Sequence, residues 1–338
     1  MLICAPCLLD LSRRKDYHGA DTILAGGGQD LNAKMLRYIF KRFLLALVTI
    51  FIIIALTFTV MHAVPSSPFN KEKALPPAVK AALEAKFGLD KPLSWQFVNY
   101  LGNIARFDFG DSIYYQGNSV IGLLGTGFRT SARLGLTAAG TALVLGILLG
   151  SLAALGRDTL GDKIIQVATT ALVSVPSFVL ALLMLWIFGV WWPILPTRGD
   201  LPMGSLMPII ALTLYPTAYV TRLTRSSMLD VLGQDYIRTA YAKGLDRFMV
   251  IFKHALRNAL TPVITYAGPM IAYIVCGSFV VEQIFSMAGL GVYFVKSIQN
   301  SDYTMIMGTT ILLSVVMISL NLICDILYTI VDKRVDLS

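Results

Sequence analysis

Apolar residues occur in this chain as long runs separated by polar segments. In a helix, about 20 apolar residues cross the hydrocarbon core of a membrane. Runs near this length are expected to form six spans, over residues 43–64, 133–155, 164–188, 207–222, 260–281 and 305–331. The second run carries small residues, which allow helices to approach closely in lipid. The third contains Pro176, which predicts a kink. The pattern predicts an all-α membrane protein with six transmembrane helices.

Lysine and arginine are distributed unevenly between the loops. Arg37, Lys41 and Arg42 directly precede the first run, and basic residues crowd the segment between the fourth and fifth runs. In the loops after the third and fifth runs, the only basic residues are Arg198 and Lys296. Because short loops rich in lysine and arginine stay in the cytoplasm, both termini are expected to be cytoplasmic.

The composition supports a membrane protein. Of the 338 residues, 56% are hydrophobic and 14% are charged, whereas a soluble domain carries about 25% charged residues. The net charge of +8 comes from basic residues between the spans rather than on one continuous face, so no nucleic-acid partner is expected. Cys4 and Cys7 lack a second ligand pair at zinc spacing, and no metal site is predicted.

The sequence also lacks the common catalytic motifs. It contains no G-x-x-x-x-G-K-[ST], H-E-x-x-H or G-x-S-x-G. We therefore expect no catalytic residues and no nucleotide site in this chain. If it moves a substrate uphill, the energy must come from a partner.

Four segments are expected along the chain. Residues 1–34 are polar and are predicted to be disordered or to lie upstream of the natural start. Residues 35–64 hold the cytoplasmic N-terminal end and the first span. Residues 65–130 form an extracytoplasmic segment, with a helix predicted over residues 77–87 before Gly88. Residues 131–338 form the membrane core, with a cytoplasmic loop over residues 223–259.

The cytoplasmic loop contains a short amphipathic pattern. Tyr236, Ile237, Ala240 and Tyr241 are expected on one side of a helix that ends at Gly244. Asp246 is expected to cap a second helix over residues 247–257. Such a segment could rest on lipid headgroups or dock into a groove on a soluble partner, and the pattern alone leaves both open.

The sequence of this loop resembles that of the cytoplasmic "EAA" loop of ABC-importer permeases, most closely in the peptide/nickel family. Arg238-Thr239-Ala240 stand in place of the acidic-Ala-Ala triplet, and Gly244 takes the glycine position. Because the glutamate is missing, a salt bridge assumed from it is not carried over. MLRYIFKRFLLAL at Met35 and EQIFSMAGLG at Glu282 also resemble this family, and the resemblance covers residues 35–338.

The resemblance implies a type I ABC importer transmembrane domain in the cytoplasmic (inner) membrane of a bacterium. It implies four kinds of partner: a second homologous permease, two cytoplasmic ABC ATPases, an extracytoplasmic substrate-binding protein and membrane lipid. ATP and Mg²⁺ would be bound by the ATPases. The implied function is import of dipeptides or oligopeptides, with nickel, opine or glutathione import as alternatives. The implied coupling residues are Tyr236, Ile237, Arg238, Thr239, Ala240, Tyr241, Lys243 and Gly244.

Polar side chains within the spans are candidates for the translocation path. They are Tyr215, Thr217, Tyr219, Tyr266, Tyr273 and Glu282. Hydroxyl groups could accept or donate hydrogen bonds to a peptide backbone, and an ionisable residue near a span is a functional candidate. The alternatives are structural: tyrosines as interface anchors or contacts between helices, and Glu282 as an interfacial polar cap.

Two hypotheses from other classes compete. An ion-driven secondary transporter predicts charged residues at mid-membrane and an inverted internal repeat, and the sequence favours neither. A membrane scaffold with a lipid-binding basic loop would need no ATPase.

Overall fold

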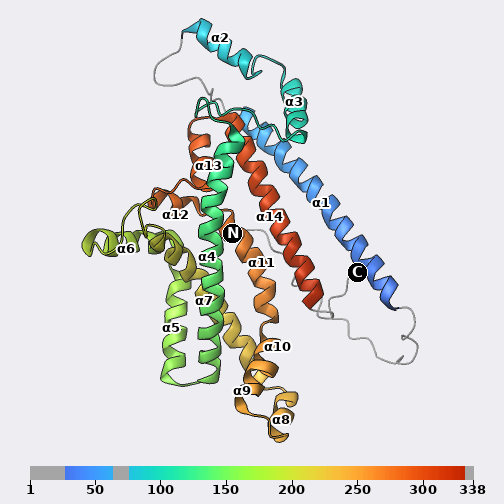
Figure 1. Cartoon of the computed structure of the whole chain (residues 1–338), viewed down its shortest axis with the longest axis vertical. Coiled ribbons are helices and arrows are strands. Elements are labelled where there is room, and N and C mark those ends of the chain that lie inside the picture. Colours follow the sequence, from blue (N-terminus) through green and yellow to red (C-terminus); the bar gives the residue numbers. More distant parts are fainter. Residues whose placement is uncertain (1–26, 64–75, 332–338) are drawn as a thin grey trace. The chain divides into compact units, whose positions relative to one another are not determined.

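Helices form all the regular structure that the described residues contain. The computed structural model describes residues 27–63 and 76–331 (Figure 1). The described residues from Ala46 onward form one compact unit, and the contacts given below lie within it. In chain order the helices are α1 (Gly27–Ala63), α2 (Pro77–Lys86), α3 (Leu93–Ala105), α4 (Val120–Leu155), α5 (Leu160–Ser174), α6 (Ser177–Met184), the π-helix η1 (Leu185–Trp191), α7 (Leu206–Leu232), α8 (Asp235–Ala242), α9 (Arg247–Met249), the π-helix η2 (Val250–Leu256), α10 (Arg257–Ala259), α11 (Thr261–Val275), α12 (Phe279–Ile284), α13 (Leu290–Gln299) and α14 (Tyr303–Val331).

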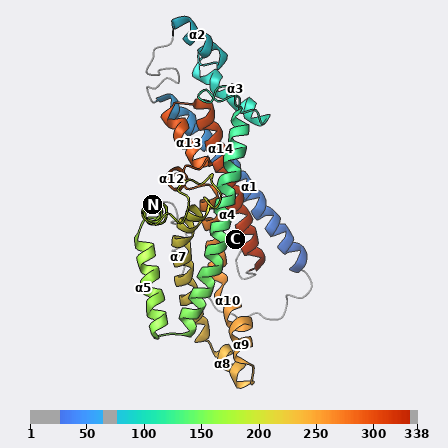
Figure 2. The ribbon, with the colours of Figure 1, turned by 60° about the vertical axis from the view of Figure 1, so that its left-hand side comes forward.

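Small residues on α4 form the centre of the packing. α4 lies beside α7 and also contacts α11 and α5 (Figures 1 and 2). A Cβ added at Gly146 would lie 2.6 Å from the Val220 side chain, and one added at Gly150 would lie 2.6 Å from the carbonyl oxygen of Thr221. Ala138, Ala139, Gly146 and Gly150 are buried, as expected for a close helix contact. Gly140 differs, because a Cβ there would meet no atom within 4 Å.

The apolar runs correspond to helices, with one large bend. Among the described residues, four stretches are long and apolar enough to cross a membrane: Phe40–Ala63, Val120–Leu155, Thr261–Ile284 and Tyr303–Cys324. A bent pair of helices in the predicted third span makes a fifth if it counts as one span, whereas the predicted fourth span, in α7, does not meet this test. The predicted third span is not a single straight helix, because α5 and the α6–η1 pair meet at 100°. The break falls at Val175 and Pro176, where proline lacks the N–H that a continuous helix requires. The chain bends at Pro176 as predicted, and the bend is a break between two helices rather than a kink inside one helix.

Several helix bounds differ from the predicted ones. α1 begins at Gly27, so residues 27–34 of the segment predicted to be disordered are helical, and the rest of that segment lies outside the described residues. α11 ends at Val275, before the predicted end of the fifth span at residue 281.

α4 begins at Val120 rather than at residue 133, because Ser119 caps its first turn by accepting a hydrogen bond from the Gly122 N–H. α7 continues past residue 222 to Leu232, so the first ten residues of the predicted cytoplasmic loop are still helical. The helix predicted over residues 77–87 is confirmed as α2.

Asp302 joins the loop before α4 to the start of α14. Its carboxylate is fully buried and accepts hydrogen bonds from the N–H groups of Ile113 (3.2 Å), Tyr114 (3.1 Å) and Met305 (3.1 Å). It also accepts one from the Ser112 hydroxyl. The Met305 bond caps α14, and the others fix the loop, so one carboxylate holds two distant segments together.

α3 packs against α1 and α14 through aromatic side chains. The Phe58 and Phe97 rings lie 5.2 Å apart, and a hydrogen bond of 3.2 Å joins His62 Nε2 to Gln96 Oε1. The same cluster includes Met307 and Ile311 of α14. α3, which lies in the segment predicted to be extracytoplasmic, is therefore fixed to the helices by these contacts.

The α4–α7 contact predicts opposite effects for two matched substitutions. Replacing glycine with alanine favours a helix by about 1 kcal/mol. Gly140→Ala should therefore leave the midpoint of thermal unfolding unchanged or raise it, since Gly140 faces open space. Gly150→Ala should lower it, because the α7 backbone would have to move. Differential scanning fluorimetry of the two purified variants measures the midpoints, and equal midpoints would contradict the packing described.

Candidate functional site

α8 is held on the core by one side only. Ile237 and Ala240 are 2% and 7% exposed and pack in a cluster with Met228 of α7 and Val250 and Ile251 of η2. The four residues predicted to share one side of this helix therefore fall into two pairs. Ile237 and Ala240 face the core, while Tyr236 and Tyr241 flank them and are each 44% exposed.

Gly244 ends α8 in the left-handed conformation, as predicted, with φ of +75°. The Gly244 N–H donates to the Tyr241 carbonyl (2.9 Å), and the Leu245 N–H donates to the Ala240 carbonyl (3.3 Å). This pair of bonds is the Schellman motif, and Leu245 completes it by packing against the same cluster as Ala240. A Cβ on Gly244 would meet no atom within 4 Å, so glycine is required here by its backbone conformation and not by crowding.

A second helical stretch follows, capped by Asp246 as predicted. The Asp246 carboxylate accepts a hydrogen bond of 2.9 Å from the Phe248 N–H. The stretch runs through α9, η2 and α10 to Ala259 and so includes the predicted range of 247–257. Its π-helical middle was not predicted. That part buries Val250, Ile251 and Ala255 against α8 and the end of α7.

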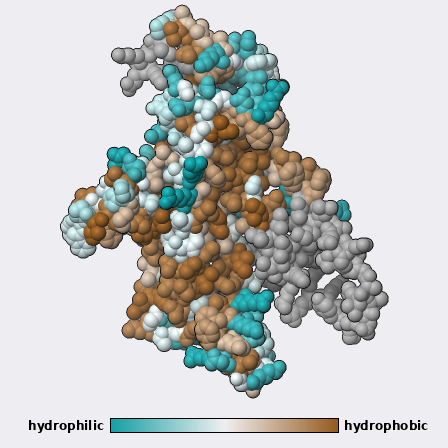
Figure 3. Space-filling view, viewed as in Figure 1, coloured by the Kyte–Doolittle hydropathy of each residue, from teal (hydrophilic) through white to brown (hydrophobic). Residues whose placement is uncertain are grey.

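The outer side of this region carries aromatic and basic groups. We call residues 235–259 the coupling segment. Phe248 and Phe252 are exposed, with ring centroids 4.3 Å apart. Arg238, Thr239 and Lys243 are also exposed, and Figure 3 shows hydrophilic side chains at the end of the molecule where α8 and α9 lie. The segment combines a buried apolar anchor with an accessible outer surface, which suits contact with another molecule.

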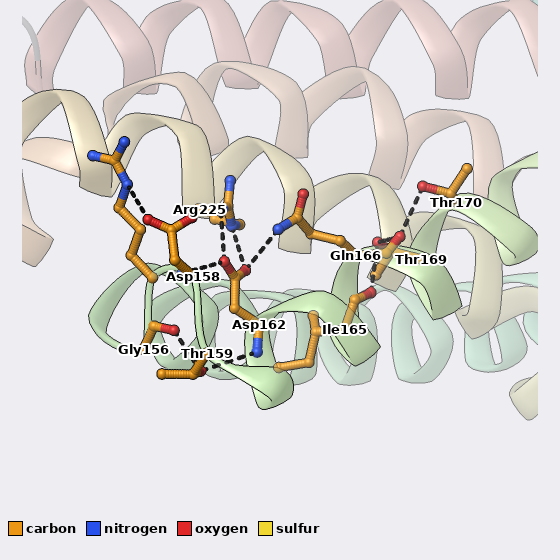
Figure 4. A network of polar contacts seen from close by, with 10 residues as sticks. Gly156, Asp158, Thr159, Asp162, Ile165, Gln166, Thr169, Thr170 and Arg225 are labelled. Carbon is orange, nitrogen blue, oxygen red and sulfur yellow. Dashed lines mark hydrogen bonds and ion pairs between the residues drawn. The ribbon is translucent and has the colours of Figure 1, made fainter.

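Behind the coupling segment, a buried ion pair joins α5 to α7. Arg225 donates from Nε to Asp162 Oδ1 and from Nη2 to Asp162 Oδ2, both at 2.7 Å. Asp162 also accepts from Gln166 Nε2 (2.9 Å) and from the Asp158 N–H (3.1 Å), as Figure 4 shows. The Asp162 side chain is 1% exposed and that of Arg225 is 21% exposed. This pair was not predicted, because no local sequence pattern links residues 63 positions apart.

Four of the predicted path residues lie on α7 and α11, where three of them are exposed and Tyr266 is half-buried. The Tyr219 and Tyr266 rings are stacked, with centroids 4.3 Å apart. Tyr215 lies one turn before Tyr219, and Tyr273 lies two turns after Tyr266. Tyr215 and Tyr219 are each 40% exposed, and Tyr273 is 72% exposed. The structure therefore gathers phenol groups from two adjacent helices.

Thr217 and Glu282 do not join these tyrosines. Thr217 is buried, and its carbonyl oxygen faces Gly146 of α4. Glu282 is 1% exposed and accepts hydrogen bonds from the Ser131 hydroxyl (2.6 Å) and the Gly291 N–H (3.0 Å). Glu282 thus ties α12 and the start of α13 to α4, an arrangement that favours its structural alternative.

The described residues contain no group of three histidine, cysteine, aspartate or glutamate side chains that could hold a metal ion. The candidate site consists of three parts: the apolar anchor of α8, the buried ion pair between α5 and α7, and the phenol groups of α7 and α11. Such groups can support docking, transmit movement and form hydrogen bonds to a solute.

Comparison with known proteins gives consistent matches over nearly the whole chain. The family described as "Binding-protein-dependent transport system inner membrane component" matches residues 146–337, and its N-terminal counterpart matches residues 35–138. The dipeptide transport system permease protein DppB of Bacillus subtilis is 45% identical over 304 residues, which are 90% of this chain and 99% of that protein. The oligopeptide transport system permease protein OppB of Haemophilus influenzae is 42% identical, over 89% of this chain and 99% of that protein.

A solved structure supports the fold. An inward facing conformation of the MetNI methionine ABC transporter aligns with a TM-score of 0.50 at 18% identity, over 62% of this chain and 96% of that chain. The resemblance to ABC-importer permeases is confirmed, and these proteins are components of transporters rather than enzymes. The chain belongs to the family of binding-protein-dependent transport system inner membrane components.

Proposed function

We propose that this chain is a transmembrane permease subunit of an ATP-driven importer that carries dipeptides or oligopeptides across the bacterial cytoplasmic membrane. The names and the high coverage of the two relatives support peptides as the substrate class. Import of nickel, an opine or glutathione is the alternative within the same family resemblance.

The way in which α8 of the coupling segment is exposed is the observation that carries this proposal. Its helix α8 buries one side against α7 and η2 and leaves the other side accessible. A short helix presented in this way fits a groove on a soluble partner, here a cytoplasmic ABC ATPase. Two ATPase subunits would bind ATP and Mg²⁺. The contact would be made by Tyr236, Arg238, Thr239, Tyr241 and Lys243, with Ile237, Ala240 and Gly244 holding the helix in place.

The remaining partners are assigned to the other surfaces. We assign six spans to α1, α4, α5 with α6–η1, α7, α11 with α12, and α14, with both termini in the cytoplasm. A second permease would face the tyrosines of α7 and α11, and the two subunits would enclose a path whose phenol groups hydrogen-bond to peptide backbone. An extracytoplasmic binding protein would deliver the peptide near α2 and α3.

Isolation followed by reconstitution tests this function. The chain, gently purified from its native membrane, should carry a P-loop ATPase and a second permease, identified by mass spectrometry. In sealed vesicles with the binding protein, this complex should take up a labelled dipeptide or oligopeptide only when ATP is present. Labelled nickel in the same assay separates the metal alternative. Uptake that follows an ion gradient without ATP would contradict the proposal and favour a secondary transporter.

A pair of substitutions at Gly244 tests the coupling segment. A side chain in the left-handed conformation costs about 1–2 kcal/mol, and a β-branched residue is especially unfavourable there. Gly244→Val should therefore disturb the end of α8 and reduce uptake relative to ATP hydrolysis by about 5- to 30-fold. Gly244→Asn is the control, because asparagine tolerates this conformation. Uptake and hydrolysis are measured in the same vesicles, and wild-type uptake by the valine variant would argue against the assigned role.

A further inference from the structure

The Asp162–Arg225 pair is held in a single geometry. Both oxygens of Asp162 are engaged by the guanidinium group, and Gln166 and the Asp158 N–H supply two more hydrogen bonds to the same carboxylate (Figure 4). A bidentate contact of this kind fixes the orientation of both side chains as well as their distance. The first turn of α5 and the last turns of α7 are therefore locked in one register.

A gain in folding stability alone does not explain why a buried ion pair is found at this position. Removing two charges from water is costly, and apolar residues of similar volume often stabilise a protein as well or better. What an ion pair offers in addition is a specific relative position of the two elements that carry it. The position of α5 relative to α7 is thus the property that this pair determines.

The pair lies next to the coupling segment. Arg225 precedes Met228 by less than one helical turn, and Met228 is fully buried in the cluster that holds Ile237 and Ala240 of α8. On the other side, a Cβ added at Gly150 of α4 would lie 3.1 Å from the backbone nitrogen of Arg225. A displacement of α8 therefore meets α7 at the level of the ion pair.

α5 leads from this level to a distant part of the molecule. At Pro176 it turns by 100° into α6, and α6 contacts α12. α12 carries Glu282, which is hydrogen-bonded to Ser131 of α4 and to the N–H of Gly291 in α13. A continuous set of contacts thus runs from the coupling segment through α7 and α5 to α6, α12 and α13, beside the direct contacts of α7 with α6 and α12.

We propose that Asp162 and Arg225 are positioning residues that make α5 move together with α7 when α8 is displaced, so that the movement reaches α6 and α12. This inference rests on the proposed function, in which an ATPase displaces α8. The pair touches neither ATP nor the peptide. It determines how much of the ATPase movement is converted into transport.

An apolar replacement separates this role from simple stabilisation. The test uses the reconstituted complex. The double variant Asp162→Leu/Arg225→Met removes the ion pair that fixes α5 relative to α7, while its apolar side chains still fill the space between the two helices. Its midpoint of thermal unfolding should fall only modestly, because the apolar pair keeps the volume filled while Gln166 and the Asp158 N–H lose their acceptor. The ATP hydrolysed per peptide transported should rise by about fivefold or more, the lower end of ordinary coupling between sites. Coupling at the wild-type ratio in this variant would overturn the inference.

Two further variants and a control complete the test. Arg225→Lys keeps the charge but loses the two parallel hydrogen bonds of the guanidinium group, so the ATP hydrolysed per peptide should rise to a smaller extent. If the double variant does not fold, this variant decides the test. The exchange Asp162→Arg/Arg225→Asp should restore part of the coupling. Arg198→Gln/Asp200→Asn removes an exposed 2.7 Å ion pair and should leave the ratio unchanged. Absence of ATP-dependent peptide uptake by the wild type would instead refute the proposed function.

Discussion

The close contact between α4 and α7 is the constraint on which the rest of the structure depends. In lipid, helices gain little from hiding apolar side chains, so they associate where their surfaces fit. Gly146 and Gly150 bring the two backbones together without intervening side chains. This contact fixes the last turns of α7, and with them the positions of Arg225 and Met228. The ion pair to α5 and the apolar anchor of α8 both start from there.

Features governed by neighbouring residues could be predicted from the sequence. The long apolar runs indicated helices because about 20 such residues must satisfy their own backbone in a membrane. Gly244 and Asp246 were recognised as the end and the start of helices, since a left-handed glycine and a capping carboxylate act within a few residues. The assignment of small residues on α4 to packing was also correct, because small side chains favour a close contact whichever helix is the partner, except that Gly140 lies outside the contact.

Features that join distant segments were not predictable. Asp162 meets Arg225 across 63 positions, Ser131 meets Glu282 across 151, and Ser112 meets Asp302 across 190. A single sequence carries no signal for such pairs, because each partner alone is an ordinary polar residue near a loop. Pro176 marked the place of the break before α6 but not its angle, which depends on how α6 packs against α7 and α12.

Three buried carboxylates among the described residues each lie at or near the start of a helix. Asp162 lies in the first turn of α5, Asp302 caps α14, and Glu282 accepts a hydrogen bond at the start of α13. At each position the N–H groups and the helix dipole favour a negative charge. These acids therefore hold helix ends in place. The tyrosines of α7 and α11 differ from them, because Tyr215, Tyr219 and Tyr273 are exposed and Tyr266, stacked on Tyr219, is half-buried. Under the proposed function, these tyrosines are therefore the polar residues within the spans that remain candidates for contact with a solute.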